Sequence, residues 1–576
     1  MNDTDSNAVG SDKVQSDREL LLNAQESGKV LGTYVKLSGP GWLQSAITLG
    51  GGSLAGALFL GVLGGTSMLW LQLVAIAMGV VMLSAISYVT LSTGRRPFEA
   101  INSEINPALG WGWLIATGLA NMIWCMPQFS LCYDALDKNL FAIGGGGGLG
   151  DSETTKLIVS AVLFFAAGTI VLMNIKQGRV AKIFDWVLKG LIGMVVLCFF
   201  GVVALLAING ELNFGEIFSG FIPSLNQWSE PTGRLGDLVA SLPAESQSFW
   251  SDKIVGNQQT VMIAAAATAV GINMTFLLPY SMLSRGWDKP FRGLARFDLS
   301  TGMAIPYILV TSCVVIAAAA SFHGRIDENL KSTDLAVMQQ SKMFDSVKGS
   351  LIARVDLTLG DAAATTDEAA KLEMVAGLSE EEKTLAAALV KRNAFQLSET
   401  LTPLLGSTLA NLVFGIGVFG MGFSTIIILM LINGYVFREM LNQPNATAPF
   451  VIGCLVAGLS GASWVYVWAG GAKFWLPIIT SSFGMMLLPV AYVTFFLMMN
   501  SKRILGDEKP KGASMLIWNV LMLISVIGAV VAAHAAIKAQ MAKSDGAYYT
   551  ILAVLIVYGI LIAIGFAFRG KKPAST

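Results

Sequence analysis

The chain has 576 residues, with 38 Lys and Arg against 38 Asp and Glu, so its formal net charge is zero. Only 13% of the residues are charged and 54% are hydrophobic, whereas a soluble domain carries roughly 25% charged residues. A neutral chain lacks the basic surface of a nucleic-acid-binding protein. A chain this apolar is neither disordered nor able to cover one soluble core. The composition predicts a polytopic membrane protein, and the pattern of its apolar runs makes it an all-α membrane protein.

The first 38 residues are polar and predict a tail outside the membrane. The 58 residues from Leu37 to Gly94 carry no charge. A spanning helix needs about 20 apolar residues. Because Gly64 and Gly65 can turn the chain midway, we expect two spans here. The same test predicts ten more, at 110–133, 157–175, 187–208, 260–284, 299–322, 402–435, 447–468, 474–499, 513–537 and 546–568.

We therefore expect about 12 transmembrane helices, and they divide the chain into eight segments. A cytoplasmic N-terminal tail precedes a first inverted repeat of five spans, an external loop, spans six and seven, a long external polar insertion, spans eight to ten, spans eleven and twelve, and a cytoplasmic tail. The predicted boundaries are 1–38, 39–208, 209–259, 260–322, 323–399, 400–500, 513–568 and 569–576.

The loop charges predict the orientation. If the N-terminus is cytoplasmic, the inner segments hold 21 Lys and Arg, and the short outer segments hold seven. Positive residues concentrate on the cytoplasmic side. We therefore expect an integral protein of the plasma (inner) membrane with both termini cytoplasmic.

The insertion at 323–399 holds thirteen acidic and nine basic residues. Ser379 and Glu382 have the spacing of a capping box, followed by a run rich in Ala and Leu. We expect a short external helical cap. The simplest interpretation is a solvent-exposed surface segment without a specific role. The alternative is a role in gating or in binding a partner.

Nothing in the sequence predicts an enzyme or a cofactor. The five cysteines form no Cys-x-x-Cys pair, and the two histidines, His323 and His534, lie far apart. Neither residue type predicts a metal site. The expected partners are a small solute or ion and the lipid bilayer, with no nucleic acid.

The cores of the predicted spans carry no charged residue, but two of them contain helix breaks. Three consecutive glycines, Gly50 to Gly52, interrupt the first span, and Gly271 and Pro279 interrupt the sixth. Interrupted spans at matching places in two repeats indicate a transporter site, although small residues also serve close helix packing. The predicted substrate-binding residues are Gly50, Gly51, Gly52, Ser53, Gly271, Asn273, Thr275 and Ser281.

An ordered set of short motifs resembles the NRAMP family of divalent-metal transporters, which have the LeuT-type fold of 5+5 inverted repeats, here with two more C-terminal helices. The resemblance covers about 39–506 without the insertion. Its pieces are Gly39-Pro-Gly-Trp-Leu43, Thr93-Gly-Arg95, Phe297-Asp298, the run from Ala317 to Gly324, Pro403-Leu-Leu-Gly406, Leu488-Pro489 and Ser501-Lys-Arg-Ile-Leu-Gly506.

The metal-binding residues of the family do not carry over. Gly50 and Ser53 stand where the family has Asp and Asn, and Asn273 and Thr275 where it has Met and His. Met274 is one position away and does not restore the ligand. A glutamine of the tenth span aligns with Leu487, and the acidic residues associated with proton movement align with Gly118 and Asn121.

The resemblance implies a secondary transporter working by alternating access. By family the substrate is a divalent metal ion, and the uncharged residues favour a hydrated or Mg²⁺-like ion over Fe²⁺ or Mn²⁺ with proton symport. One alternative is a Na⁺-coupled or uncoupled carrier of a small organic solute, such as an amino acid bound at Gly50–Ser53. Another is a non-transporting binder. Ser424 and Thr425 are candidates for a coupling-ion site.

Overall fold

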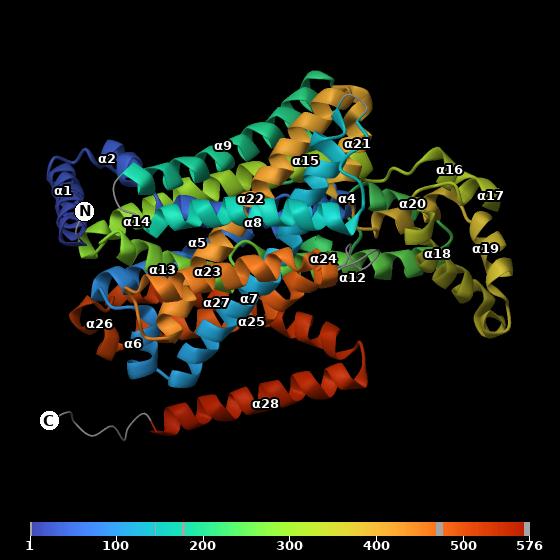
Figure 1. The fold of residues 1–576 in the computed structure, drawn as a ribbon. Coiled ribbons are helices and arrows are strands. Elements are labelled where there is room, and N and C mark those ends of the chain that lie inside the picture. The colour runs from blue at the N-terminus through green and yellow to red at the C-terminus, as the bar shows by residue number, and fades with distance from the viewer. Residues whose placement is uncertain (1–2, 144–145, 176–178, 468–475, 569–576) are drawn as a thin grey trace.

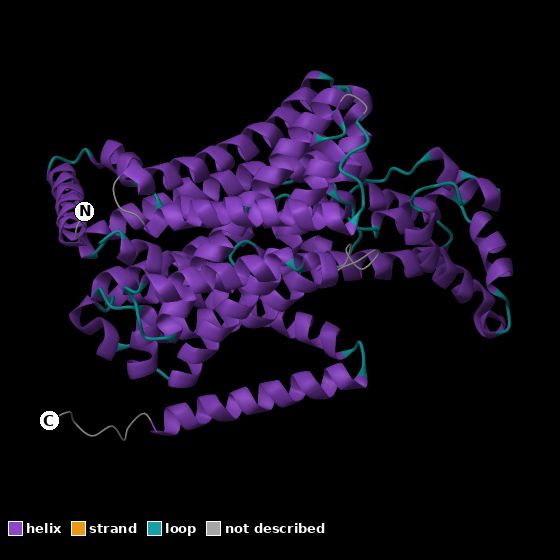
Figure 2. Ribbon diagram, viewed as in Figure 1, coloured by secondary structure: helices purple, strands orange, loops and turns teal. Residues whose placement is uncertain are grey.

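The computed structural model describes residues 3–143, 146–175, 179–467 and 476–568. These residues form helices and connecting loops, without a strand (Figure 2). Most of the long helices run along the long axis of the molecule (Figure 1). Helix α1 (Asp3–Glu26) and the C-terminal end of α28 (Asp545–Phe568) lie at one end, and the insertion lies at the other. We call these the terminal end and the insertion end.

Eleven of the twelve predicted spans are recovered within the described residues. Ten helical segments are long and apolar enough to cross a membrane, and an eleventh span is a bent pair formed by α3 (Pro40–Thr48) and α4 (Gly51–Gly64). The other spans are α5 (Trp70–Thr93), α7 (Pro107–Ala135), α8 (Glu153–Ile175), α9 (Arg179–Ile208), the run Lys289–Phe322, α22 (Ser407–Met440), α23 (Thr447–Ala462), α25 (Leu476–Asn500), α27 (Gly512–Met541) and α28.

The sixth span is broken at Gly271, as expected, but it begins earlier than predicted. It is divided into α12 (Ala244–Thr268) and α13 (Ile272–Ser284). The first sixteen residues of α12 lie in the predicted external loop. Because this part of the helix is polar, α12 and α13 do not together pass the test for a membrane span. The rest of that loop folds into α10 (Phe214–Ser219), a short 3-10 turn and α11 (Arg234–Ala240).

The predicted eighth span is continuous from Ser407 onwards, as α22. The chain breaks earlier, at Gly406, between α21 (Ala394–Leu405) and α22. Gly406 has φ +75°, a conformation that favours glycine. The glycines within α22 instead permit close packing against neighbouring helices. A Cβ at Gly422, for example, would lie 2.7 Å from Cys132 Sγ.

Two acidic residues are buried within helices that extend beyond the predicted spans. Asp298 lies in α14 (Arg292–Leu299), inside the run Lys289–Phe322, and is 1% exposed. Its carboxylate accepts the N–H groups of Gly39 and Gly41 at 3.2 and 2.6 Å and the hydroxyl of Ser38. It thereby joins the start of α3 to α14. Glu439, near the end of α22, pairs with Arg96 at 2.9 Å.

The insertion has a hydrophobic core of its own. Helices α18 (Phe344–Leu359), α19 (Glu368–Ala376) and α20 (Glu380–Ala388) pack with two short helices, α16 (Glu328–Lys331) and α17 (Leu335–Met338), and this core continues to Trp250 of α12 and Phe59 of α4. The expected helix after Ser379 is confirmed, because the Ser379 hydroxyl accepts the Glu382 N–H at 3.3 Å. The insertion is therefore a folded cap seated on the bundle.

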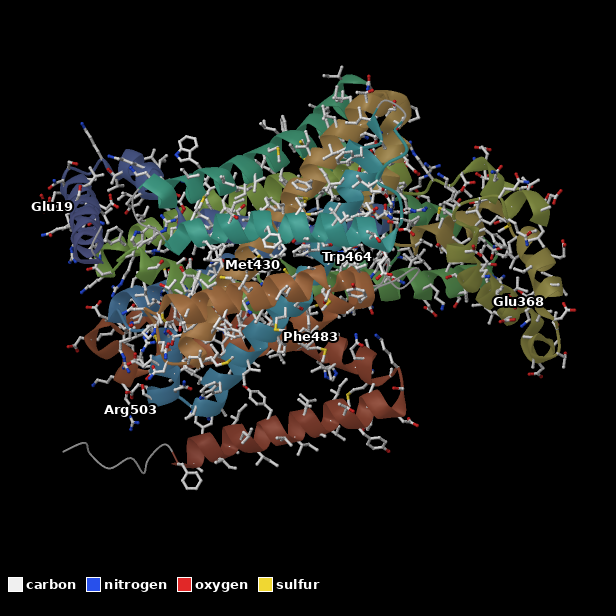
Figure 3. All side chains as sticks on the ribbon, viewed as in Figure 1. Glu19, Glu368, Met430, Trp464, Phe483 and Arg503 are labelled. Carbon is white, nitrogen blue, oxygen red and sulfur yellow. The ribbon has the colours of Figure 1, made fainter. Side chains whose placement is uncertain are left out.

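Side chains pack between the helices of the bundle, whereas α28 lies at its edge and has no buried residue (Figure 3). Met430 of α22 and Trp464 of α24 (Trp464–Val467) lie in the bundle, between Glu19 in α1 and Glu368 in the cap. Both Met430 and Trp464 are buried.

Candidate substrate cavity

The first span bends by 55° between α3 and α4. Gly50 links the two helices in an extended conformation, with φ −89° and ψ −179°. A Cβ at Gly50 would lie 2.9 Å from Thr425 Oγ1 and 3.1 Å from the Ile47 carbonyl oxygen. Glycine is therefore needed here for the close approach of α22 to the break.

The second break lies between α12 and α13. Gly271 is extended, with φ −84° and ψ 166°, directly before the first residue of α13. A Cβ at Gly271 would lie 2.7 Å from Asn273 Oδ1 and 2.9 Å from the ring of Trp124. Pro279 lies inside α13 and does not end the helix.

A cavity of about 110 Å³ joins the two breaks. Its walls come from α3, α4, α7, α13, α22 and α25, and no charged residue is among them. The lining residues are Ile47, Thr48, Gly50, Gly52, Ser53, Trp124, Pro127, Gln128, Ala269, Gly271, Asn273, Met274, Thr425, Leu429, Gly484 and Met485. The described part of the chain holds no group of three His, Cys, Asp or Glu residues that could bind a metal ion.

Hydrogen bonds hold the first break in place. The Gly51 N–H donates to Gln128 Oε1 at 3.1 Å, which ties the start of α4 to α7. The Ser53 hydroxyl donates back across the break to the Thr48 carbonyl at 2.5 Å. The Thr48 hydroxyl reaches the Gln44 carbonyl at 2.9 Å and the Met274 sulfur at 3.4 Å. The last contact connects the two broken spans.

Asn273 is the buried amide at the second break. Its Oδ1 accepts the Met274 N–H at 2.9 Å. Its Nδ2 is buried and has no hydrogen-bond partner among the described residues. Leaving a buried donor unpaired costs free energy, so a molecule in the cavity would gain by accepting this hydrogen bond.

The helix ends give the cavity both signs of partial charge. Helices α4 and α13 begin at it, and the N–H groups in a first turn have no carbonyl partner within their helix. The C-terminal end of α3 lies at the same space, where Ile47 and Thr48 line the cavity. Such half-helix ends bind anionic groups at N-termini and cations at C-termini.

The structure brings together six of the ten predicted residues around the cavity. Gly50, Gly52, Ser53, Gly271, Asn273 and Thr425 line it.

The other four, Gly51, Thr275, Ser281 and Ser424, are not among its lining residues. Thr275 accepts the indole N–H of Trp113 at 3.0 Å, and Ser281 donates to the Leu278 carbonyl at 2.8 Å. Both hydroxyls therefore have partners within the protein.

Ser424 and Thr425 meet the first span where it breaks. Their hydroxyls reach the Ala46 carbonyl oxygen at 3.2 and 3.0 Å. Both also bond to the Met421 carbonyl one turn back in α22. Two hydroxyls and a carbonyl near a helix C-terminus are the kind of oxygen ligands that cations accept.

Sequence reasoning missed part of the lining. Trp124 and Gln128 have the i, i+4 spacing of one face of α7, and Gln128 is the partner of the first break. Met274, which we did not expect to restore the ligand, lines the cavity, and Met485 joins it from α25. Soft thioether sulfur is therefore present at the site, without a carboxylate.

The family model described as "Natural resistance-associated macrophage protein-like" (Nramp) matches residues 41–355 and 375–534. No curated protein matches the chain.

Solved structures of the Eremococcus coleocola manganese transporter are similar. A mutant of it has 13% identity and a TM-score of 0.65, with 94% of this chain and 96% of that chain covered. The complex with an aromatic bis-isothiourea substituted compound has 12% identity and a TM-score of 0.63 over the same shares. At this identity, the likeness shows a common fold.

Proposed function

This chain belongs to the Nramp family, and on that premise we propose that it carries a partly hydrated metal ion across the membrane through the uncharged cavity at its two helix breaks. Its fold is the all-α, LeuT-type transporter fold. In such folds, alternating access comes from rocking of helix bundles around a site at the broken spans.

The lack of charge around the cavity carries the proposal. Stripping the water from a divalent ion is very costly unless charged ligands replace it. The lining offers amides, hydroxyls, helix ends and two thioethers, but no carboxylate. A cavity that holds one water needs roughly 10–15 Å³, so about 110 Å³ leaves room for several waters beside an ion. The ion can therefore keep part of its shell.

This reasoning favours Mg²⁺ or a similarly hydrated ion. Mg²⁺ releases water reluctantly and is usually bound with several waters in place. The sulfurs of Met274 and Met485 suit softer ions, but two neutral sulfurs do not supply the charge that a dehydrated Mn²⁺ or Fe²⁺ would need. Proton symport of the family type has no acidic residue in the cavity to carry the proton.

A coupling ion is proposed at Ser424 and Thr425. The site would be formed by their hydroxyls and the Ala46 carbonyl. A monovalent ion such as Na⁺ fits neutral oxygen ligands, because its dehydration costs less than that of a divalent ion. It would hold α22 against α3 while the cavity is occupied.

An organic solute is the second candidate. The observation that favours it is the meeting of the N-termini of α4 and α13 at one cavity, since such ends bind carboxylates. Against it, the Gly51 N–H, which a carboxylate would use first, already donates to Gln128.

We place both termini in the cytoplasm and the cap outside, in the plasma (inner) membrane. The orientation rests on the excess of basic residues in the predicted inner segments. The position of α1 and the end of α28 at one end of the molecule is consistent with it (Figure 1).

Uptake into proteoliposomes tests the function. Liposomes with the purified protein in the membrane and a Mg²⁺-sensitive dye inside should take up Mg²⁺ faster than dye-filled liposomes without protein. Excess Mn²⁺ should inhibit this Mg²⁺ uptake only weakly. Micromolar inhibition by Mn²⁺ would instead indicate a dehydrated transition metal. Uptake of an amino acid without any Mg²⁺ uptake would favour the organic solute.

The variant Gly51→Leu tests the place of the site. A side chain there would start 3.1 Å from Leu131 Cδ2 and 3.3 Å from Gln128 Oε1, so it would displace Gln128 and abolish uptake. Gly56→Leu is the matched control, because a Cβ at Gly56 in the same helix meets nothing within 4 Å. Equal uptake by both variants would remove the site from this break.

A further inference from the structure

Below the cavity, towards the terminal end, three fully buried amide side chains have polar atoms without partners. They are Gln44 in α3, Asn121 in α7 and Asn433 in α22, each with an exposed fraction of 0%. Neither polar atom of Gln44 or of Asn121 has a hydrogen-bond partner among the described residues, and Oδ1 of Asn433 has none. Native proteins rarely bury polar groups in this way.

Helical spacing places the three amides below the cavity lining. Gln44 precedes the lining residue Thr48 by four positions in α3. Asn121 precedes Trp124 and Gln128 by three and seven positions in α7. Residues at these spacings share one face of a helix. In both helices the chain runs from the terminal end towards the cavity, so each amide lies one turn nearer the terminal end.

Helix α22 runs in the opposite direction, from the cavity towards the terminal end, and its amide also lies below the cavity. Asn433 follows the lining residues Leu429 and Thr425 by four and eight positions. Its Nδ2 donates to the Gly453 carbonyl at 2.9 Å, which leaves Oδ1 for the opposite side. There it lies 3.6 Å from the place of a Cβ at Gly118, one turn before Asn121. Oδ1 of Asn433 thus faces α7.

We propose that Gln44, Asn121 and Asn433 form a second, uncharged station for the hydrated metal ion on its way from the cavity to the terminal end. We call these three residues the amide station. The inference rests on the proposed function. Three amide oxygens on three helices, with waters, are ligands that a hard divalent cation accepts. An ion with its waters would satisfy every one of the unpaired atoms.

The next layer towards the terminal end closes the path. Aromatic rings stack from α13 to α22, with Phe276 and Tyr280 at 4.4 Å and Tyr280 and Tyr435 at 6.0 Å between centroids. Beyond them, the guanidinium of Arg96 binds both carboxylate oxygens of Glu439 at 2.9 and 3.1 Å.

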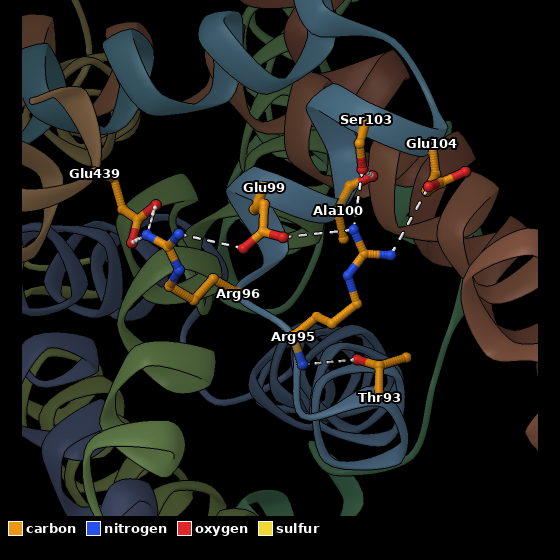
Figure 4. A network of polar contacts seen from close by, with 8 residues as sticks. All are labelled: Thr93, Arg95, Arg96, Glu99, Ala100, Ser103, Glu104 and Glu439. Atoms are coloured by element: carbon orange, nitrogen blue, oxygen red, sulfur yellow. Dashed lines mark hydrogen bonds and ion pairs between the residues drawn. The ribbon is translucent and has the colours of Figure 1, made fainter. Parts of the chain in front are cut away.

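The same Arg96 also binds Glu99 at 3.2 Å, and Arg95 extends the network to Glu104 (Figure 4). This network joins the loop after α5 and helix α6 (Pro97–Glu104) to the end of α22. The station therefore lies between the cavity and a closed barrier, where an ion would wait for the barrier to open.

The test replaces an unpaired amide by an apolar side chain of similar size. If Asn121 has only a structural role, Asn121→Leu should be neutral or stabilising, because it removes two unsatisfied polar atoms. If it belongs to the station, Mg²⁺ uptake into proteoliposomes should fall about tenfold, the effect of losing one ligand to a charged group, while the melting temperature stays equal or rises. Gln44→Leu should behave in the same way.

The control is Ser312→Ala in α15 (Ile305–Phe322). It too removes a buried polar group without a partner, here a hydroxyl, but it lies outside the cavity-lining helices. It should leave uptake unchanged. Normal uptake by both Asn121→Leu and Gln44→Leu would overturn the station and leave the proposed function intact.

A second readout separates the two proposals. Mg²⁺ should still raise the melting temperature of Asn121→Leu, because the cavity above is unchanged. If the unmodified protein neither takes up Mg²⁺ nor responds to it in melting, the proposed function itself has failed. Loss of the melting response in Asn121→Leu alone would assign Asn121 to the first site and overturn a separate station.

Discussion

Gly50 shows how closely a single position is fixed by its surroundings. Its missing Cβ is what lets Thr425 of α22 approach the break, since that atom would lie 2.9 Å from Thr425 Oγ1. The same hydroxyl reaches the Ala46 carbonyl at 3.0 Å. One methyl group at Gly50 would therefore disturb both the cavity wall and the proposed coupling-ion site.

We expect Gly50→Ala to destabilise the protein by about 1–3 kcal/mol, the usual cost of overpacking, and to slow uptake. Adding Thr425→Ala should restore the stability, because it removes the colliding atom, but should not restore ion coupling. Thermal unfolding in detergent measures the first effect, and uptake with and without Na⁺ measures the second.

Gly56→Ala in the same helix is the control for this pair. A Cβ there meets nothing within 4 Å, and alanine in a helix interior is favoured over glycine by about 0.5–1 kcal/mol. The variant should be as stable as the parent or more so. A loss of stability equal to that of Gly50→Ala would refute the steric explanation.

At the level of elements, the cap depends on one buried ion pair. Arg354 Nε binds Glu382 Oε1 at 2.8 Å, with both side chains 8% exposed. The same carboxylate oxygen accepts the indole N–H of Trp250 at 3.2 Å, which links the cap to α12. Removing one partner of a buried pair leaves an uncompensated charge and costs about 3–5 kcal/mol.

Arg354→Met should therefore open the cap locally and expose it to a protease, while the bundle stays folded. Limited proteolysis followed by mass spectrometry would locate the cuts within 323–399. Lys342→Met is the matched control, since the Lys342–Glu399 pair has side chains 85% and 66% exposed, and exposed pairs contribute little. Equal protection of both variants would show that the pair does not hold the cap.

His323 joins three elements at the insertion end. His323 directly follows the last residue of α15. Its Nδ1 lies 3.0 Å from the carbonyl oxygen of Val62 in α4. Its Nε2 lies close to Gly233, the residue before α11, where a Cβ would be only 3.1 Å away. Burial lowers the pKa of His323, although the hydrogen bond to Val62 opposes this shift.

A lowered folded-state pKa means that the unfolded chain binds the proton more readily, so stability should fall as the pH drops below about 6.5, the ordinary pKa of histidine. Melting temperatures from pH 8 to pH 5 should show this loss for the parent and much less of it for His323→Gln. His534→Gln, at an exposed position of α27, should keep the parent profile. Identical profiles for all three proteins would contradict the assignment.

The sequence predicted the elements better than their contacts. Long uncharged runs identify spans because the bilayer core excludes charge. The three glycines from Gly50 located the first break and Gly271 the second, whereas Pro279 lies inside α13 and breaks nothing. The early start of α12 was not predicted, because its first half is a polar segment that the test for apolar runs assigns to a loop. The ends of α14 and α22 were also missed, because Asp298 and Glu439 are each held by partners that are distant in the sequence.

The site was predicted only in part, because some of its residues leave a local signal in the sequence and others depend on long-range contacts. Backbone breaks leave a local signal in the residues that break, so Gly50 and Gly271 could be named. Gln128 and Met274 could not, because their roles depend on how α7 and α13 are rotated towards α3 and α4. An amide or a thioether in an apolar helix has the same local pattern whether it faces a cavity, a neighbouring helix or lipid.

At the scale of the whole molecule, the two ends differ in kind. The terminal end carries α1 and a layer of ion pairs between elements, such as Lys289 and Arg292 with Glu508 at 2.5 and 2.7 Å. The insertion end carries the folded cap. With the basic inner segments in the cytoplasm, the ion would enter past the cap, reach the cavity and leave through the layer of ion pairs.

This orientation predicts which residues can be labelled from outside a cell. Glu368 in the cap and Glu19 in α1 are exposed and lie at opposite ends (Figure 3). Glu368→Cys should react with a membrane-impermeant maleimide on intact cells, and Glu19→Cys only after the membrane is permeabilised. The parent is a suitable background, since four of its five cysteines are buried and Cys198 is only partly exposed. The opposite labelling pattern would reverse the orientation and place the amide station on the outer side of the cavity, so that the proposed direction from cap to ion pairs would no longer describe uptake.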